Sequence, residues 1–356
     1  MQKNILITGG AGFVGSSIAI FLKKEYPQYS ICCLDNLVRK GSELNLPRLA
    51  ENGIKFVRGD VRNKKDLENL GEEITTIIDA AAEPSVLSGI NDSPEYLVNT
   101  NLVGTFNCLM LAAKCKSDFI FLSTSRVYPI EKLESVAFTE NDSRFELSSQ
   151  QEIAGVSPMG INEDFPLQGY RSLYGATKLS SELLVEEFRK FYNIQTVIDR
   201  CGVITGPWQM GKIDQGVAVL WVARHFWKQE LSYFGYGGKG KQVRDLLHID
   251  DLCLLIDLQL HRMQEMNGKI FNVGGGSEKS ISLLELTAIC ETATGNKIKI
   301  NEVKEDREAD IRIYISNNST IAKATGWQPK RSIHDTVSDI YSWIKQNELI
   351  LKPILS

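Results

Sequence analysis

Tyr174 and Lys178 are the two residues whose types and spacing most clearly suggest catalysis. They lie four residues apart in the stretch 170–184, whose pattern predicts a helix, so their side chains would share one face. A phenol ordinarily loses its proton near pH ~10, and a neighbouring ammonium lowers that pKa because it stabilises the phenolate. Such a tyrosine could take a proton from a sugar hydroxyl at neutral pH. Alone, the spacing is more typical of a surface tyrosine and a solvated lysine, so a dinucleotide site elsewhere is needed to make it specific.

The stretch 170–184 is also amphipathic. Its polar side carries Ser180, Ser181 and Glu182, and its apolar side carries Leu179, Leu183 and Leu184.

A glycine-rich turn near the N-terminus predicts the dinucleotide site. Gly9, Gly12 and Gly15 follow an apolar run over 3–8 that is typical of a buried strand, and a helix is expected over about 13–24. Such a turn lets the backbone approach a pyrophosphate, and the helix N-terminus then offers free N–H groups to the phosphates. A glycine-rich turn without a ligand is the alternative reading.

Asp35 indicates which dinucleotide would bind. It ends the expected strand 30–34, 20 residues after Gly15, where a carboxylate accepts hydrogen bonds from the adenosine ribose. A carboxylate there repels a 2′-phosphate, which favours NAD over NADP. Arg39 and Lys40 lie nearby and keep NADP open.

The elements that must position these residues alternate between strands and helices. Further strands are expected over 55–57, 75–79, 118–122 and 196–200, with helices over 64–70 and 99–114. This alternation predicts a doubly wound parallel α/β sheet, whose ligands bind at the carboxyl ends of the strands. The glycine turn, Asp35, Asp60, the segment 80–82 and Thr124 would all lie there.

Composition excludes several other classes of protein. The net charge of -4 argues against a nucleic-acid surface, and no run approaches the ~20 apolar residues of a membrane helix. The N-terminus enters a strand pattern directly, so the cytoplasm is the expected compartment. Seven cysteines without C-x-x-C and four histidines without ligand spacing predict buried thiols and no metal site.

These motifs together resemble the extended short-chain dehydrogenase/reductases. The matching features are the glycine turn, Asp35, Asp60-Val61, Asn101 in NLVGT, Ser123-Thr124, and Tyr174-x-x-x-Lys178. The resemblance implies a catalytic group of Thr124, Tyr174 and Lys178, in which Tyr174 is the acid/base, Lys178 binds the nicotinamide ribose and Thr124 bonds the reacting sugar oxygen. It also implies a homodimer formed through the helices near Thr105 and Tyr174.

The resemblance implies two further sets of binding residues. NAD would be bound by Gly9, Gly12, Phe13, Val14, Gly15, Asp35, Asn36, Arg39, Asp60, Val61, Ala80, Ala81, Ala82, Asn101, Ser123, Tyr174, Lys178, Cys201 and Val203. A nucleotide-diphosphate sugar would be bound by Glu83, Ser85, Thr124, Ser125, Arg126, Gln209, Gln215, Arg244 and Arg307. Arg244, in QVRDLLHIDD, and Arg307 would hold the diphosphate, since guanidinium groups meet phosphate oxygens bidentately. His248 and Asp251 are expected to be structural.

Length and loop pattern predict two domains. The chain of 356 residues fits an NAD-binding domain over 1–204, with 241–275 returning to it, and a smaller α/β substrate lobe over 205–356. The segment 126–169 is too long for an ordinary connection and predicts a flap, with disorder as the alternative.

Several blocks narrow the expected reaction. The blocks 35–41, 59–64, 214–216, 240–245 and 282–286 resemble those of CDP-paratose 2-epimerases, also called CDP-tyvelose epimerases. That resemblance implies inversion at C2 of the sugar: Tyr174 takes the hydroxyl proton while hydride moves to NAD, the 2-ketose rotates, and hydride returns to its other face. A 4,6-dehydratase is disfavoured because Ser125-Arg126 stands where dehydratases have Asp-Glu. A nucleotide-sugar 4-epimerase or 4-reductase, and a non-catalytic NAD sensor, are the alternatives.

Overall fold

The computed structural model describes residues 2–71, 73–90, 93–211 and 215–356 and divides into two compact units. The first comprises Met1–Val127, Ser172–Arg200 and Cys253–Phe271, and the second comprises Tyr128–Arg171, Cys201–Leu252 and Asn272–Ser356. The chain passes repeatedly between the units, whereas the sequence predicted a first domain running to residue 204. The expected flap thus groups with the second unit, and the returning segment is 253–271 rather than 241–275.

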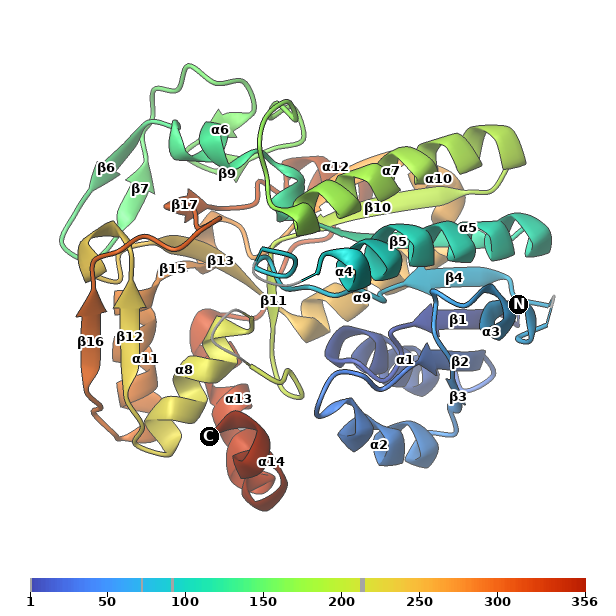
Figure 1. Cartoon of the computed structure of the whole chain (residues 1–356), viewed down its shortest axis with the longest axis horizontal. Helices are drawn as coiled ribbons and strands as arrows, with labels where there is room; N and C mark the ends of the chain where they lie inside the picture. The colour runs from blue at the N-terminus through green and yellow to red at the C-terminus, as the bar shows by residue number, and fades with distance from the viewer. Residues whose placement is uncertain (1, 72, 91–92, 212–214) are drawn as a thin grey trace. The chain divides into compact units, whose positions relative to one another are not determined.

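A seven-stranded sheet forms the centre of the first unit (Figure 1). Its order is β14-β10-β5-β4-β1-β2-β3, and the pairs β1–β2, β1–β4, β2–β3 and β4–β5 are parallel. The bounds are β1 (Asn4–Thr8), β2 (Ser30–Asp35), β3 (Lys55–Arg58), β4 (Thr76–Asp79), β5 (Asp118–Thr124), β10 (Thr196–Cys201) and β14 (Lys269–Val273). Chain order reverses between β1 and β4, which confirms the predicted doubly wound fold.

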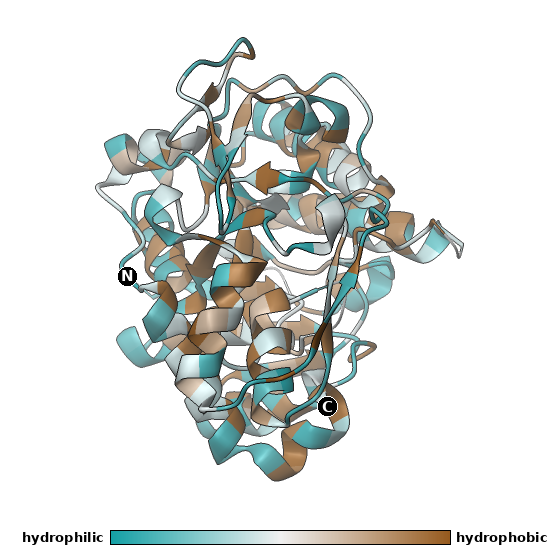
Figure 2. Ribbon diagram, turned by 90° about the vertical axis from the view of Figure 1, so that its left-hand side faces the viewer, coloured by the Kyte–Doolittle hydropathy of each residue, from teal (hydrophilic) through white to brown (hydrophobic). Residues whose placement is uncertain are grey.

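Helices cover this sheet and contribute to its core. They are α1 (Phe13–Glu25), α2 (Asn45–Glu51), α3 (Lys64–Glu68), α4 (Glu95–Val98), α5 (Gly104–Cys115), α7 (Leu173–Tyr192), α9 (Ile249–His261) and α10 (Met263–Met266). One core cluster joins the apolar runs of β1, β4 and β5 to α5 and α7, through residues such as Leu6, Ile77, Leu109, Phe119 and Val185. Figure 2 shows hydrophobic and hydrophilic residues along individual helices, as expected for elements with one buried side.

The second unit contains smaller sheets. The strands β11 (Val203–Thr205), β13 (Val243–His248), β15 (Ser280–Ser282) and β17 (Ile313–Tyr314) form one, and β12 (Leu231–Phe234) pairs with β16 (Ile300–Val303) in another. Three helices pack on one another: α8 (Val217–Phe226), α11 (Leu283–Thr294) and α13 (Ile333–Gln346). The unit also includes α12 (Ser319–Thr325) and ends with α14 (Glu348–Leu355), which the sequence did not predict.

The expected flap has regular secondary structure. It contains α6 (Ile130–Glu134) and two antiparallel hairpins, β6 (Phe138–Glu140) with β7 (Phe145–Leu147) and β8 (Val156–Ser157) with β9 (Gly160–Ile161). Phe145 is buried with Val243, Ile313 and Ile315 in a core cluster of the second unit. This packing contradicts the alternative of disorder, because the hairpin contributes to a core. Within the described residues, no helix is long and apolar enough to cross a membrane.

Candidate active site

The glycine turn between β1 and α1 leaves room for a ligand only because it lacks side chains. Gly9 has a φ of +62°, and a Cβ on it would lie 2.8 Å from the carbonyl oxygen of Ala80. A Cβ on Gly15 would lie 2.3 Å from the carbonyl oxygen of Gly9, and one on Gly12 would lie 3.1 Å from it. Each glycine therefore permits a close backbone approach, which is the requirement that predicted them.

The N-terminus of α1 is suited to an anion. Gly12 caps this helix without a side-chain hydrogen bond, and no acidic residue lies in the first turn, which Phe13 and Val14 open. Amide N–H groups at a helix start have no intrahelical acceptor and carry the positive end of the helix dipole. The pyrophosphate of a dinucleotide fits this position.

Asp35 holds the glycine turn from the end of β2. Its Oδ2 accepts a hydrogen bond of 3.1 Å from the Ala11 amide, and its Oδ1 accepts one of 2.8 Å from the Leu37 amide. Burial raises the pKa of this carboxyl, and the backbone donors oppose that rise. A half-buried carboxylate at this place can still accept ribose hydroxyls, as the sequence predicted for NAD.

Asp60 joins the ends of β2 and β3. Its carboxylate accepts hydrogen bonds from Arg62 at 2.6 and 2.9 Å and from the Asn36 side chain at 3.0 Å. The Arg62 hydrogen bond is the main reason that the pKa of Asp60 falls to about 2. Val61 is buried against α5, where a Cβ on Gly104 would lie 2.6 Å from it. Asp60 and Asn36, predicted to touch NAD, thus also shape this loop.

The small residues after β4 are fixed from three sides. The Ala81 amide donates to Thr8 Oγ1 at 3.2 Å, and Thr8 in turn donates to Asp79 Oδ1 at 2.6 Å. The other Asp79 oxygen accepts a hydrogen bond of 2.9 Å from Thr105. Sequence reasoning missed this buried threonine–carboxylate–threonine bridge, because its members come from three separate elements. Through Thr8, it holds the backbone of Ala81.

Asn101 lies in a π-helical turn, Asn99–Val103, between α4 and α5. Its Oδ1 accepts a bond of 2.8 Å from the Glu83 amide, and its Nδ2 donates to the Glu83 carbonyl at 3.1 Å and to Thr177 Oγ1 at 3.3 Å. Fully buried, Asn101 connects the loop after β4 to α7. The Glu83 carboxylate accepts a bond of 3.0 Å from the amide of Ser85, so these two predicted substrate residues form one turn.

The catalytic pair predicted on α7 faces the end of β5. Tyr174 and Lys178 are 9% and 2% exposed, and the Lys178 Nζ lies 4.0 Å from the centroid of the Phe121 ring. Phe121 precedes Thr124 on β5, and α7 packs against both β5 and the turn Ser125–Val127 that follows it. The side chain of Ser172 caps this helix by accepting a bond of 3.2 Å from the Gly175 amide. A solvated surface pair is thereby excluded.

The polar and apolar sides of α7 do not coincide with its exposed and buried sides. Ser181 and Glu182 are buried, and Leu183 is 58% exposed, whereas Leu184 packs against the core. Glu182 can be buried because Arg200 on β10 and Ser123 on β5 satisfy its carboxylate. Ser123, predicted to contact NAD, therefore points its hydroxyl at Glu182.

The remaining predicted residues of the first unit lie at the same edge of the sheet. Arg39 is half-buried in the loop after β2, and Ser125 and Arg126 are half-buried in the turn after β5. The Arg126 amide donates to Thr124 Oγ1 at 3.2 Å. The Thr124 hydroxyl is therefore oriented by its own turn, with its hydrogen available to another acceptor.

Predicted residues of the second unit fall into two groups. Cys201 ends β10, Val203 begins β11, and Gln209 follows in a loop where its Oε1 accepts a bond of 2.9 Å from Thr205. The Gln209 Nε2 donates to the Ile204 carbonyl at 2.9 Å, so this amide stabilises its own loop. Gln215 is half-buried, and the predicted block 214–216 begins at a residue outside the described part of the chain.

The second group surrounds the predicted diphosphate arginines. Arg244 on β13 donates to Asp310 Oδ1 at 2.9 Å and to the Ile311 carbonyl at 2.6 Å. The guanidinium carbon of Arg307 lies 3.7 Å from the centroid of the Phe234 ring on β12. The structure thus brings Arg244 into contact with the same loop, 307–311, that carries Arg307.

Asp251 and His248, both expected to be structural, lie in the second unit. Asp251 accepts hydrogen bonds from the amides of Lys330 and Arg331, which agrees with the structural role expected of it. His248 is buried, and burial lowers its pKa.

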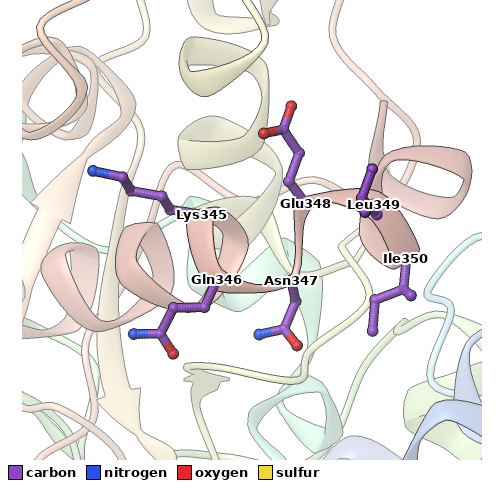
Figure 3. Close-up of a pocket in the computed structure, with 6 residues that line it drawn as sticks. All are labelled: Lys345, Gln346, Asn347, Glu348, Leu349 and Ile350. Carbon is purple, nitrogen blue, oxygen red and sulfur yellow. The ribbon is translucent and has the colours of Figure 1, made fainter.

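A surface hollow at the junction of α13 and α14 is lined by 345–350 and contains no predicted site residue (Figure 3). Among the described residues, no cluster of metal-binding side chains occurs.

Comparisons with known proteins identify the family of this chain. The family described as "NAD dependent epimerase/dehydratase family" matches residues 5–274. CDP-paratose 2-epimerase of Salmonella typhi is 31% identical over 350 residues, covering 95% of this chain and 98% of that protein. A dTDP-glucose 4,6-dehydratase of Streptomyces antibioticus is 27% identical, covering 99% of this chain and 95% of that protein.

A solved structure shares the whole fold. The crystal structure of UDP-glucuronic acid 4-epimerase from Bacillus cereus, in complex with UDP-glucuronic acid and NAD, superposes with a TM-score of 0.79 at 26% identity, covering 96% of this chain and 99% of that one. The predicted NAD cofactor is confirmed, and relatives that are epimerases agree with the predicted isomerase. The family match spans the glycine turn, Asp35, Thr124, Tyr174 and Lys178, and this chain belongs to the NAD-dependent epimerase/dehydratase family.

Proposed function

We propose that this protein is an NAD-dependent nucleotide-sugar epimerase that inverts C2 of a CDP-linked 3,6-dideoxyhexose, interconverting CDP-paratose and CDP-tyvelose. The observation that carries the proposal is the burial of Tyr174 and Lys178 on the face of α7 that packs against the end of β5. The similarity to CDP-paratose 2-epimerase over 95% of the chain supports the choice of substrate.

The glycine turn, Asp35 and the start of α1 would hold the cofactor, which supplies reversible hydride acceptance when bound. Tyr174 takes the proton of the C2 hydroxyl and later returns it. Lys178 favours the phenolate form of Tyr174 by its charge, and Thr124 donates a hydrogen bond to the reacting oxygen. Arg244 and Arg307 anchor the diphosphate while the ketosugar turns, so that its opposite face is presented before proton return.

Dehydration needs more than this site offers. Removal of water from C5 and C6 requires further acid/base groups, and the two positions after Thr124 are Ser125 and Arg126, neither of which is a carboxylic acid. Epimerisation needs only one acid/base, one hydride acceptor and room for the sugar to turn. A nucleotide-sugar 4-epimerase is the second candidate, because the structural relative with UDP-glucuronic acid has that activity in its name. A 4-reductase would use the same residues.

The proposal is tested by incubating the purified protein separately with CDP-paratose, CDP-tyvelose, UDP-glucose and UDP-glucuronic acid, and separating the products by chromatography. We expect the two CDP-sugars to interconvert without net consumption of NAD, and Tyr174→Phe to lower kcat by at least about 100-fold. Inversion of a UDP-sugar at C4 alone would replace the first candidate by the second. Stoichiometric consumption of added NADH or NADPH would identify a reductase.

We also propose that the protein is a cytoplasmic homodimer that pairs through α5 and α7. The outer faces of these helices expose apolar side chains, including Phe106, Leu183 and Phe191, of which Phe191 is 77% exposed. Two copies could cover these side chains by forming a four-helix bundle. Light scattering of the wild type and of Leu183→Glu should give a dimer and a monomer, respectively. A monomeric wild type would contradict the dimer and leave the reaction open.

A further inference from the structure

A buried charge cluster within the first unit connects the three elements that carry or flank the catalytic residues. Glu182 on α7 and Arg200 on β10 are 2% and 3% exposed. The Arg200 Nη2 lies 2.7 Å from Glu182 Oε2, and its Nε lies 3.1 Å from both carboxylate oxygens. Ser123 on β5 donates a fourth bond, of 2.5 Å, to Glu182 Oε1. All four contacts are charge-assisted hydrogen bonds, the strongest kind between side chains.

Members of this cluster neighbour the proposed catalytic residues, both along the chain and on α7. Ser123 immediately precedes Thr124, and Glu182 follows Lys178 by four residues, as Lys178 follows Tyr174. All three α7 residues therefore lie along one helix face, and all three are buried. The Ser123–Glu182 bond consequently joins the strand end that carries Thr124 to the helix face that carries Tyr174 and Lys178.

Glu182 forms its ion pair with Arg200 and not with the lysine on its own helix. A lysine and a glutamate four residues apart on a helix can pair with each other. Here Lys178 instead stacks on Phe121, and the Glu182 carboxylate receives a bidentate guanidinium from a different strand. Because Arg200 compensates the charge of Glu182, the Glu182 carboxylate already has a cationic partner other than Lys178.

We infer that Glu182 and Arg200 are positioning residues, which fix Thr124 against Tyr174 through Ser123 and prevent Glu182 from neutralising Lys178. The inference rests on the proposed use of Tyr174 as the acid/base. It extends that proposal to two residues, 182 and 200, to which the sequence analysis gave no role.

Ser123→Ala tests the positioning of Thr124 without breaking the buried ion pair. We expect kcat to fall roughly 10- to 100-fold with KM changed less than about twofold, since small displacements of reacting groups have effects of this size. Ser117→Ala is the matched control: Ser117 is fully buried just before the opposite end of β5, and its hydroxyl donates to the Ile74 carbonyl at 2.6 Å. The control should lose a similar amount of thermal stability and keep its kcat. Equal kcat values in both variants would overturn the positioning role.

Arg200→Met and the double variant Arg200→Met/Glu182→Leu test the charge argument without any sugar. The ionisation of Tyr174 is followed with NAD bound, by the ultraviolet absorbance of tyrosinate, after subtraction of the same titration of Tyr174→Phe. In Arg200→Met, Glu182 is free to pair with Lys178, so Tyr174 should ionise about one pH unit higher, and the double variant should return toward the wild type.

Unchanged ionisation in Arg200→Met, or an equal shift in both variants, would overturn the charge argument. If the Glu182–Arg200 pair were purely structural, Arg200→Met would lower the melting temperature and NAD retention, and the double variant would not return the ionisation of Tyr174 toward the wild type. If Arg200→Met does not fold, Ser123→Ala still decides the positioning role. If the wild type turns over none of the sugars, the titration still separates this inference from the proposed reaction.

Discussion

Asp199 on β10 is a carboxylic acid placed where its ionisation opposes folding. Its side chain is fully buried, and its Oδ1 accepts a hydrogen bond of 2.7 Å from Gln259 Nε2 on α9. Burial raises the pKa of this carboxyl to about 7, and the Gln259 bond only partly offsets that rise. We predict that Asp199→Asn, which keeps the shape and the acceptor oxygen, stabilises the protein above neutral pH.

The direction in which stability changes with pH follows from the number of protons that the folded and unfolded chains bind. Below about pH 4 the carboxyl is protonated in both folded and unfolded chains, and it contributes no difference. Between its ordinary pKa of 3.8 and the folded value of about 7, the unfolded chain releases the proton while the folded chain keeps it, so stability falls as pH rises. At 1.36 kcal/mol per pH unit, this interval corresponds to about 4 kcal/mol at pH 8.

Thermal unfolding of wild type and Asp199→Asn, measured from pH 4 to pH 8, tests this reasoning. The difference in melting temperature should be near zero at pH 4, grow through pH 5 to 7, and level off by pH 8 in favour of the variant. Asp164→Asn, at an exposed carboxylate, is the control and should show no such trend. A difference that stays constant with pH, or that grows against the variant, would refute the buried-carboxyl account.

Three further predictions concern the glycine turn, cofactor choice and the diphosphate loop. Gly15→Ala should abolish co-purification of NAD, because its Cβ would lie 2.3 Å from the Gly9 carbonyl oxygen. Gly53→Ala should lose some stability, because Gly53 has a φ of +66°, but should retain NAD, since its Cβ would meet nothing within 4 Å. Asp35→Ala should raise the affinity for NADP relative to NAD by about tenfold or more in a binding titration; an unchanged ratio would assign the choice elsewhere. Ala309, at a φ of +58°, has a conformation that glycine adopts freely, so Ala309→Gly should stabilise the fold by about 1 kcal/mol in urea unfolding; destabilisation would contradict the strain.

Much of the catalytic centre was predictable because its signals are local. The glycine turn needs three residues without side chains within one turn, and Asp35 needs only to end the next strand. Tyr174 and Lys178 share a helix face through their spacing alone. Family resemblance then connected these separate motifs, and the observed strand order places the ends of β1, β2, β4 and β5 at one edge of the sheet.

The orientation of α7 was not predictable in this way. From a helical pattern one expects apolar side chains to be buried and charged ones to be exposed. Glu182 is nevertheless buried, because Arg200, 18 residues away on β10, and Ser123, on β5, hydrogen-bond to its carboxylate. Leu183 is exposed on the opposite side although it is apolar. Local sequence cannot reveal such compensation, since the penalty of burying a charge depends on partners from other elements.

The sequence by itself determined the dinucleotide fold, the cofactor and the candidate catalytic pair, because each depends on residues close together in the chain. Only the tertiary structure decided that Asp79 is held between two threonines, that Asn101 joins the β4 loop to α7, and that Glu182 lies inside. These contacts are long-range hydrogen bonds among buried polar groups. Their energies depend on geometry that forms only when strands and helices from distant parts of the chain meet.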